Sequence, residues 1–192
     1  MLHSPIMKTN LPQHTLDHIV LDHATILDRI EEMALTASKK YRGQSPIFLR
    51  IQDGADKFAD LYEVAARRHG LDFATGTITI KSMAGSESNG EPKIVKDYVG
   101  PSISGRDVVL VEDIVDTGLT IDYLIKHLSV LKPKSIKTVA LFVKDERRQV
   151  SDMEFEDIGF QVTGFVVGFG LDFDDHYRDL PDLWLVKFPE ET

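Results

Sequence analysis

The chain has 192 residues, of which 42% are hydrophobic, and a formal net charge of −9 at pH 7. This length is that of one domain with its own core, and the acidic balance argues against a general surface for nucleic acid or anionic membrane, which needs a basic face. Cysteine is absent, which excludes disulfides and thiolate metal sites and suits a reducing compartment.

The sequence shows neither a membrane-spanning nor a secretory signal. No apolar stretch approaches the length that crosses a bilayer, and the first five residues lack the apolar core of a signal peptide. We therefore expect a cytoplasmic protein without membrane contact. Residues 1–17 are polar and contain two prolines, which predicts a loose N-terminal arm. Because no repeat or linker is visible, residues 1–192 are expected to form a single domain.

The first part of the chain predicts alternating strands and helices. After a short strand at 19–21, Asp22 is a favoured helix cap, and the helix that follows is apolar on one face. A strand is predicted at 47–51, and a second helix begins after Gly54 and stops at Gly70. Residues 73–80 alternate threonine with apolar residues, as in a half-buried strand. The inward helix positions are Ile26, Ile30, Met33, Ala34 and Ala37, then Phe58, Leu61, Tyr62 and Ala65.

Residues 82–105 show no hydrophobic period and are rich in Ser, Gly, Glu, Lys and Pro. A loop of this length inside a compact domain is either a lid or a disordered segment. The alternation of strands and helices on both sides of it predicts an α/β fold with a doubly wound, mainly parallel sheet. The later predicted elements are strands at 108–111, 136–143, 165–167 and 184–186, and a helix with Ile121, Leu124, Ile125 and Leu128 on one face that ends at Pro133.

The most informative segment runs from Val108 to Thr120. An apolar run, typical of a strand buried on both faces, is followed at once by Glu112 and Asp113, then by Asp116 and a small polar turn that opens a helix. Open α/β sheets bind ligands at the carboxyl ends of their strands, and the amides of a helix start bind anions. Carboxylates can bind hydroxyl groups or a metal ion, and the neighbouring amides can bind a phosphate. Together they suit a phosphorylated sugar as the ligand.

This segment resembles the phosphoribosyl-diphosphate signature of the type I phosphoribosyltransferases, in the form found in their hypoxanthine/guanine branch. The resemblance spans roughly residues 18–187 and implies the family fold: a mainly parallel sheet flanked by helices, a small hood made by the N- and C-terminal segments, and a flexible lid loop over residues 82–105. The other matching segments, in order, are Arg29, 53–55 with Phe58, 60–61, 72–73, 141–144, 165–168, 171–173 and 177–181.

The resemblance implies a reaction of purine salvage. In it, a 5-phosphoribosyl group passes from phosphoribosyl diphosphate to N9 of a 6-oxopurine, with Mg²⁺, giving IMP or GMP and diphosphate. The alternative is a nucleotide-binding regulator, which should carry a basic face, or a catalytically weak paralogue that keeps the phosphoribosyl site. The choice among hypoxanthine, guanine and xanthine stays open. The family implies a homodimer or homotetramer.

On the signature segment, the resemblance makes Asp116 the general base for the purine N7 proton, while helix capping is a role that it could share. Glu112 and Asp113 would hold the ribose hydroxyls directly and through Mg²⁺, since a charged pair after a buried run is costly unless it is used. Two solvated acids at a strand end are the alternative. The implied 5′-phosphate cradle is Thr117, Gly118, Leu119 and Thr120.

Further along, Lys144 would bind the exocyclic oxygen of the purine, and a cation there rejects the amino group of adenine. Phe165 would stack on the base and the main chain at Val166 would read the ring edge. Asp172 would hold a second Mg²⁺ through water, and Arg178 would contact the leaving diphosphate. The alternatives are a surface lysine for Lys144 and a core aromatic for Phe165.

The chain departs from the family pattern at two places. Asp53 and Gly54, after Gln52, stand where the family has Leu-Lys-Gly at the diphosphate, with a cis peptide before the lysine. The negative charge of Asp53 predicts weaker donor binding unless Mg²⁺ bridges the two. In the lid, Ser82 and Met83 replace Ser-Tyr, and the flexible methionine predicts looser closure. Neither change touches the general base or the phosphate cradle.

Overall fold

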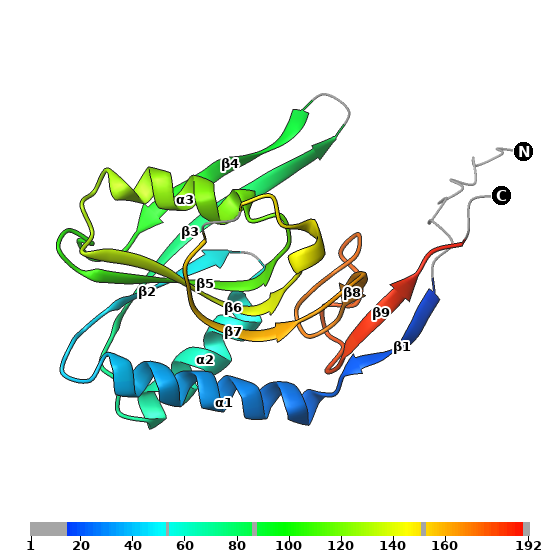
Figure 1. Ribbon diagram of the computed structural model, residues 1–192, viewed down its shortest axis with the longest axis horizontal. Helices are drawn as coiled ribbons and strands as arrows, with labels where there is room; N and C mark the ends of the chain where they lie inside the picture. Colours follow the sequence, from blue (N-terminus) through cyan, green and yellow to red (C-terminus); the bar gives the residue numbers. More distant parts are fainter. Residues whose placement is uncertain (1–14, 53, 86–87, 151–152, 190–192) are drawn as a thin grey trace, which may run out of the picture.

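The computed structural model describes residues 15–52, 54–85, 88–150 and 153–189, apart from the side chains of residues 82–91. Its strands form a six-stranded sheet in the order β4-β3-β2-β5-β6-β7 and a three-stranded sheet in the order β1-β9-β8 (Figure 1). The large sheet consists of β2 (Ile47–Gln52), β3 (Ala74–Gly85), β4 (Ser88–Val99), β5 (Asp107–Val115), β6 (Ser135–Val143) and β7 (Phe155–Gln161). The small sheet consists of β1 (Thr15–Leu21), β8 (Phe165–Val167) and β9 (Leu183–Lys187).

The large sheet is covered on both faces. Helices α1 (His23–Lys40) and α2 (Asp56–Arg68) lie on one face and α3 (Leu119–Ser129) lies on the other (Figure 1). Strand β2 shows how the sequence divides the core, because Phe48 packs with the α1–α2 side while Leu49 packs with the α3 side. The strands from β2 and β3 through β5 and β6 to β7 are parallel, and only β4 is antiparallel. The predicted α/β fold is confirmed.

Local signals in the sequence explain where the helices begin and end. The Thr25 N–H donates to Asp22 Oδ1 at 2.9 Å, so Asp22 caps α1 as predicted. Gly70 follows the end of α2 with φ +77°, a left-handed conformation that favours glycine. Helix α3 ends at Ser129, before the predicted stop at Pro133. None of the helices in the described ranges is long and apolar enough to cross a membrane.

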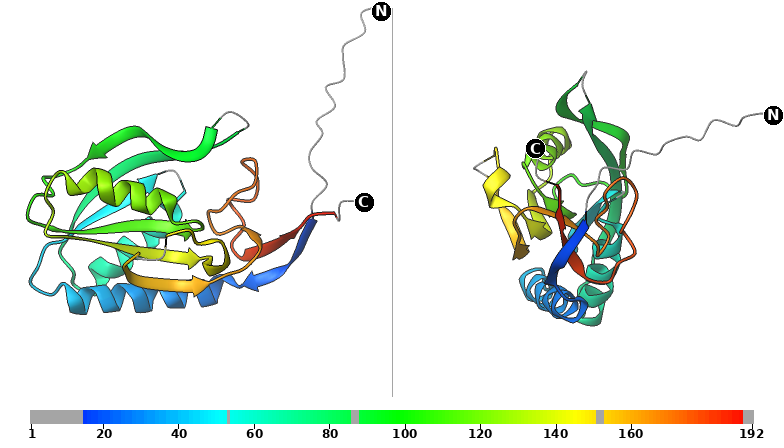
Figure 2. Two further views of the ribbon diagram at one scale, coloured as in Figure 1. Left: turned by 45° about the horizontal axis from the view of Figure 1, so that its top comes forward. Right: turned by 90° about the vertical axis from the view of Figure 1, so that its right-hand side faces the viewer.

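The small sheet joins the two ends of the described chain into the predicted hood. Strand β9 lies between β1 and β8 and is antiparallel to both, with Thr15 opposite Lys187. Figure 2 shows this hood beyond the carboxyl ends of the central parallel strands. Residues 15–17 therefore belong to a strand and not to the predicted loose arm, because the C-terminal segment supplies a pairing partner that local sequence does not reveal. The rest of that arm, residues 1–14, lies outside the described residues.

Two elements differ from the sequence prediction. The expected loop over 82–105 is largely strand: β3 continues to Gly85 and pairs with β4 as an antiparallel hairpin, with Ile80 opposite Ile94. Strand β7 was not predicted at all, although it pairs in parallel with β6. Both β4 and β7 are edge strands of the sheet. An edge strand packs fewer side chains, so backbone pairing can form it without a strong apolar period.

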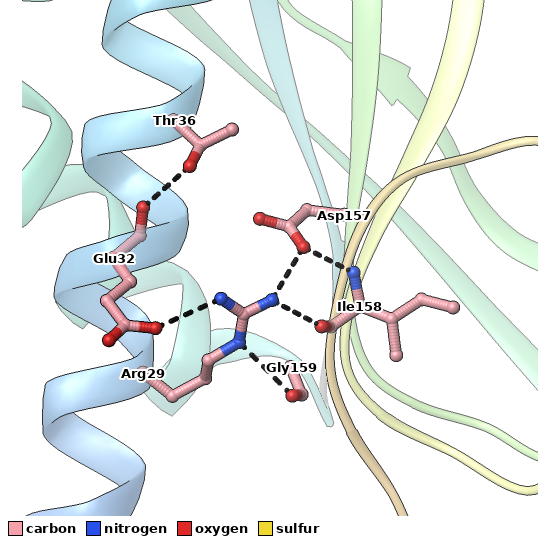
Figure 3. Close-up of polar contacts among 6 residues, drawn as sticks. All are labelled: Arg29, Glu32, Thr36, Asp157, Ile158 and Gly159. Carbon is pink, nitrogen blue, oxygen red and sulfur yellow. Dashed lines mark hydrogen bonds and ion pairs between the residues drawn. The ribbon is translucent and has the colours of Figure 1, made fainter.

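Arg29, one of the residues in the family resemblance, joins α1 to the edge strand β7 (Figure 3). Its Nη2 donates to Asp157 Oδ1 at 2.8 Å and to the Ile158 carbonyl at 2.7 Å, while Nε donates to the Gly159 carbonyl at 3.2 Å. Glu32 accepts from Nη1 on the helix side. Because all three guanidinium nitrogens donate to these partners, Arg29 has a structural role and holds the edge strand β7 in place.

Candidate active site

Two adjoining pockets lie where the central strands end. The first, of about 150 Å³, is lined by Ile51, Gln52, Gly54, Ile80, Glu112, Asp113 and Thr120. The second, of about 240 Å³, is lined by Asp113, Ile114, Asp116, Lys144, Phe165, Val166, Leu171 and Asp172. Asp113 belongs to both linings. The residues predicted to contact the ribose thus line the first pocket, and those predicted to contact a base line the second. The Asp113 carboxylate lies between the two groups.

The first pocket contains two adjacent carboxyl groups, those of Glu112 and Asp113. Burial raises the pKa of Asp113 to about 6, although hydrogen bonds from the N–H groups of Ile114 and of Asp113 itself act in the opposite direction. Burial, reinforced by the charge of Asp113, raises the pKa of Glu112 well above its ordinary value. Neither acid forms an ion pair within the part of the chain that the structure describes. Such carboxylates favour a bound cation or hydroxyl donors.

Gly54 packs directly against this acid pair. A Cβ atom at Gly54 would lie 2.8 Å from Asp113 Oδ2, closer than such atoms approach one another. A side chain at position 54 would therefore displace the carboxylate from the wall between the pockets. Asp53, which was predicted to replace a diphosphate-binding lysine, lies outside the described residues, as do the side chains of Ser82 and Met83.

The two oxygens of Asp116 have different surroundings. Oδ2 lies 3.1 Å from Nη1 of Arg147 and 4.0 Å from Nζ of Lys144. Oδ1 is buried and accepts no hydrogen bond from any residue that the structure describes. A buried carboxylate oxygen without a donor is costly, so this atom favours a ligand that offers an N–H or O–H group. The capping role is not seen, since the residue before α3 is Gly118.

Lys144 is a buried cation and not the surface lysine of the alternative interpretation, since its side chain is 6% exposed. It follows β6, and its N–H donates to the Val115 carbonyl at 2.9 Å, which fixes it beside the end of β5. Burial lowers the pKa of Lys144, and the charge of Asp116 partly opposes this effect. Nζ lies 5.6 Å from the ring centroid of Phe165. The second pocket thus places a positive charge beside an aromatic face.

Phe165 is held by two other rings of the hood. It meets Phe173 edge-to-face at 5.2 Å and Phe188, which follows β9, at 5.5 Å. Phe173 and Phe188 also contact one another at 5.8 Å. Phe165 is half-buried in this cluster and still lines the second pocket. The sequence did not point to Phe188, because nothing local shows that the chain end returns to this site.

Asp172 and Arg178 form an ion pair at 2.8 Å at the rim of the second pocket. The other oxygen of Asp172 accepts from the Asp175 N–H at 2.9 Å, so both carboxylate oxygens have protein partners. Arg178 also donates to the Gly170 carbonyl at 3.4 Å. Its positive charge partly opposes the effect of burial, which raises the pKa of Asp113. Arg178 is therefore close enough to the acid pair to influence it, while its side chain remains partly exposed.

The predicted phosphate cradle is the turn between β5 and α3. Gly118 precedes the helix with φ +83°, and a Cβ there would lie 2.7 Å from Cε of Met153, so glycine is required by the turn and by packing. Thr117 accepts from the Gln149 N–H at 2.9 Å through its carbonyl and from the Leu119 N–H at 3.4 Å through Oγ1. Thr120 lines the first pocket. The first N–H groups of α3 thus start next to the acid pair.

The carboxylates predicted to hold Mg²⁺ do not form a closed metal site. Across the described ranges, no three His, Asp or Glu residues converge as a ligand set. Mg²⁺ bound to phosphorylated substrates is usually held by one or two carboxylates, with phosphate and water oxygens completing the octahedron. Glu112 and Asp113 fit that donor set, because they are adjacent and without an ion-pair partner in the described residues, and because Asp113 is buried and Glu112 half-buried.

Comparisons with known proteins agree with this arrangement. A family model described as a phosphoribosyl transferase domain matches residues 18–174. The hypoxanthine-guanine phosphoribosyltransferase of Bacillus subtilis is 34% identical over 178 residues, 91% of this chain and 96% of that protein. The enzyme of the same name from Streptococcus thermophilus is 36% identical over 88% of this chain and 92% of its own. The crystal structure of a hypoxanthine-guanine phosphoribosyltransferase from Bacillus anthracis superimposes with a TM-score of 0.78 at 30% identity, covering 91% of this chain and 99% of the other.

Proposed function

The chain belongs to the phosphoribosyltransferase family, and from this membership we infer that it catalyses hypoxanthine/guanine phosphoribosyl transfer. The reaction moves a 5-phosphoribosyl group from phosphoribosyl diphosphate to N9 of a 6-oxopurine, giving IMP or GMP and diphosphate in purine salvage. The observation that carries the assignment furthest is the second pocket, in which an acid, a buried cation and an aromatic ring line one cavity. A phosphorylated sugar would occupy the adjoining first pocket.

Asp116 is the proposed catalytic residue. As N9 of the purine attacks the anomeric carbon, the proton on N7 becomes more acidic and needs an acceptor. Oδ1 is the carboxylate oxygen without a protein donor in the described residues, whereas Oδ2 faces two cations. We therefore assign the N7 proton to Oδ1. Asp116 would thus act as a general base through Oδ1, while its other oxygen, Oδ2, is held by the two cations.

Lys144 and Phe165 are the proposed determinants of base recognition. The Lys144 ammonium can only donate hydrogen bonds, so it suits the oxo group of hypoxanthine or guanine and opposes the amino group of adenine. Phe165 offers a ring face to the base, and the backbone of Val166 offers the edge contacts. Preference among hypoxanthine, guanine and xanthine depends on those edge contacts and is left to measurement.

The first pocket is the proposed site for the ribose and its phosphates. Glu112 and Asp113 would accept hydrogen bonds from the ribose hydroxyls, and the amides of residues 117–120 at the start of α3 would bind the 5′-phosphate. Gly54 and Arg178 would lie along the departing diphosphate, together with Asp53. The hairpin tip that contains Ser82 and Met83 would cover the reacting ribose.

Mg²⁺ is the proposed cofactor. Glu112 and Asp113 would hold it directly, and Asp172, whose oxygens already have partners, would act through water. When bound, the ion would offset the negative charge that collects on the diphosphate. We also propose a homodimer or homotetramer, which sedimentation of the purified protein would test.

The experiment is a turnover assay with phosphoribosyl diphosphate and each of hypoxanthine, guanine, xanthine and adenine, with Mg²⁺ and with excess chelator. We expect product with hypoxanthine or guanine, little with adenine, and loss of activity with chelator. A folded protein that binds IMP without turning over any base would instead indicate the nucleotide-binding regulator or weak paralogue. That result would contradict the proposed activity.

A further inference from the structure

Arg147 contacts the proposed catalytic carboxylate of Asp116, but the proposed reaction assigns it no role of its own. It ends the short 3-10 helix η1 (Asp145–Arg147), directly after Lys144. In the sequence it belongs to the run Asp145-Glu146-Arg147-Arg148, which has the composition of a solvated turn. In the structure its Nη1 lies 3.1 Å from Asp116 Oδ2, although more than half of its side chain, 58%, is exposed.

The segment that carries Arg147 is fastened to the β5–α3 turn on both sides of this contact. Before it, the Lys144 N–H donates to the Val115 carbonyl, and after it, the Gln149 N–H donates to the Thr117 carbonyl, both at 2.9 Å. Val150 and Met153 then pack against Gly118. These two backbone bonds hold the segment around Arg147 next to the segment that carries Asp116. The ion pair therefore depends on the backbone arrangement as well as on the conformation of the long Arg147 side chain.

We propose that Arg147 is a positioning residue for the Asp116 carboxylate. It binds Oδ2 and thereby fixes the rotation of the carboxyl group, which leaves Oδ1 without a donor among the described residues. Lys144, at 4.0 Å from Oδ2, is too distant to fix that rotation through a hydrogen bond, and it is needed for the base oxygen. The inference rests on the proposed function, since it assigns Arg147 a role only through Asp116.

This role makes a specific kinetic prediction. An interaction that orients a general base matters most in the transition state, so its loss lowers kcat and leaves KM for either substrate nearly unchanged. We expect Arg147→Ala to lower kcat about tenfold, less than the roughly 10²-fold that a 1 Å misplacement of a catalytic group can cost, because Asp116 itself remains. Arg147→Lys keeps a charge but lacks the planar fork, so it should recover part of this loss.

A double-mutant cycle with Asp116→Asn tests the route of the effect. If Arg147 acts through the carboxylate, Arg147→Ala should change kcat little in the Asp116→Asn background. If Arg147 instead contacts the diphosphate, KM for phosphoribosyl diphosphate should rise and the effect should persist in that background. This second outcome would overturn the proposal.

The matched control is Arg68→Ala, because Arg68 is also an exposed arginine paired with an acid, Glu31, but lies on α2 away from both pockets. It should leave kcat and KM unchanged. Wild-type turnover is measured first, so that failure of the proposed activity is recognised before any variant is compared. An active wild type with an unaffected Arg147→Ala variant would reject the positioning role alone.

Discussion

The two pockets differ in how complete they are without a ligand. In the second pocket the charged groups have partners: Asp116 faces Arg147 and Lys144, and Asp172 pairs with Arg178. In the first pocket Glu112 and Asp113 are both acids, both have raised pKa values, and neither has an ion-pair partner in the described residues. The proposed base pocket is therefore organised in advance, whereas the proposed sugar pocket would need its ligands and a cation to balance its charge.

The strongest test of the second pocket is removal of the Asp116 carboxylate. Asp116→Asn keeps the shape but cannot accept a proton, and we expect kcat to fall about 10²–10³-fold, as for loss of a general base. Binding of the base should change little, because the lysine and the stacking ring remain. Steady-state kinetics give both quantities, and circular dichroism checks the fold. Activity within twofold of wild type would contradict the assignment of Asp116.

Removal of the buried cation should produce the next largest effect. Lys144→Met keeps the length and apolar volume of the side chain but removes the donor to the base oxygen. We expect KM for hypoxanthine to rise about 10–100-fold, since a buried partner loses a charge-assisted hydrogen bond. Discrimination against adenine should fall in the same assay. Equal losses for adenine and hypoxanthine would show that Lys144 acts by another route.

The incomplete pocket makes a prediction about stability and pH. The pKa of Asp113 is raised in the folded protein to about 6, from a reference of 3.8, so the folded state binds this proton more tightly. Stability from this group is present below the unfolded pKa and is lost as pH rises through about 6, by up to about 3 kcal/mol at 1.36 kcal/mol per unit. Burial raises the pKa of Glu112 in the same direction.

Asp113→Asn removes this titration, so its free energy of unfolding relative to wild type should increase between pH 4.5 and pH 7. Urea unfolding at several pH values measures the difference. Asp72→Asn, at an exposed acid that precedes β3 and so lies at the other end of the parallel strands, is a control for the general effect of removing an acid. Phosphoribosyl diphosphate with Mg²⁺ should restore wild-type stability at pH 7 by binding the ionised form. A pH-independent difference between variant and wild type would contradict the raised pKa.

The smallest expected effect concerns position 53, where the chain departs from the family pattern. Asp53→Lys replaces a negative charge with the lysine typical of the family, and we expect the Kd for phosphoribosyl diphosphate to fall about threefold to tenfold, more at low salt. Calorimetry at two ionic strengths measures it, with Asp53→Asn as the intermediate case. Unchanged affinity in both variants would mean that position 53 does not face the diphosphate.

Local sequence predicts those helices and strands whose apolar pattern and capping residues all lie within one continuous segment. Val108–Val111 is apolar on both faces and Asp22 is a side-chain cap three residues from its amide partner, so β5 and α1 were predictable. Strand β7 was missed because its side chains are only half-buried at the sheet edge. Strand β4 was missed for a related reason. It forms by pairing with β3, and the sequence of one segment alone does not reveal that pairing.

The candidate site divides in a similar way. Residues of the second pocket were predicted because a family resemblance carries Asp116, Lys144 and Phe165 together. Arg147 and Phe188 were not predicted, since their roles depend on contacts between segments that are distant in the chain or on a turn whose composition indicates only solvation. The sequence therefore predicted which residues take part in the reaction, and the structure was needed to show which contacts hold their side chains.

The pairing of β1 with β9 has a practical consequence for protein engineering. Thr15 lies opposite Lys187, so the outer ends of these strands are neighbours in an antiparallel ladder. A short linker that starts after Phe188 and runs back to Thr15 would join these ends and retain that ring. A circular permutant linked in this way, with new termini in the exposed turn at Gly105, would keep the ring cluster of Phe165, Phe173 and Phe188. Both new chain ends would then be available for fusion to another domain.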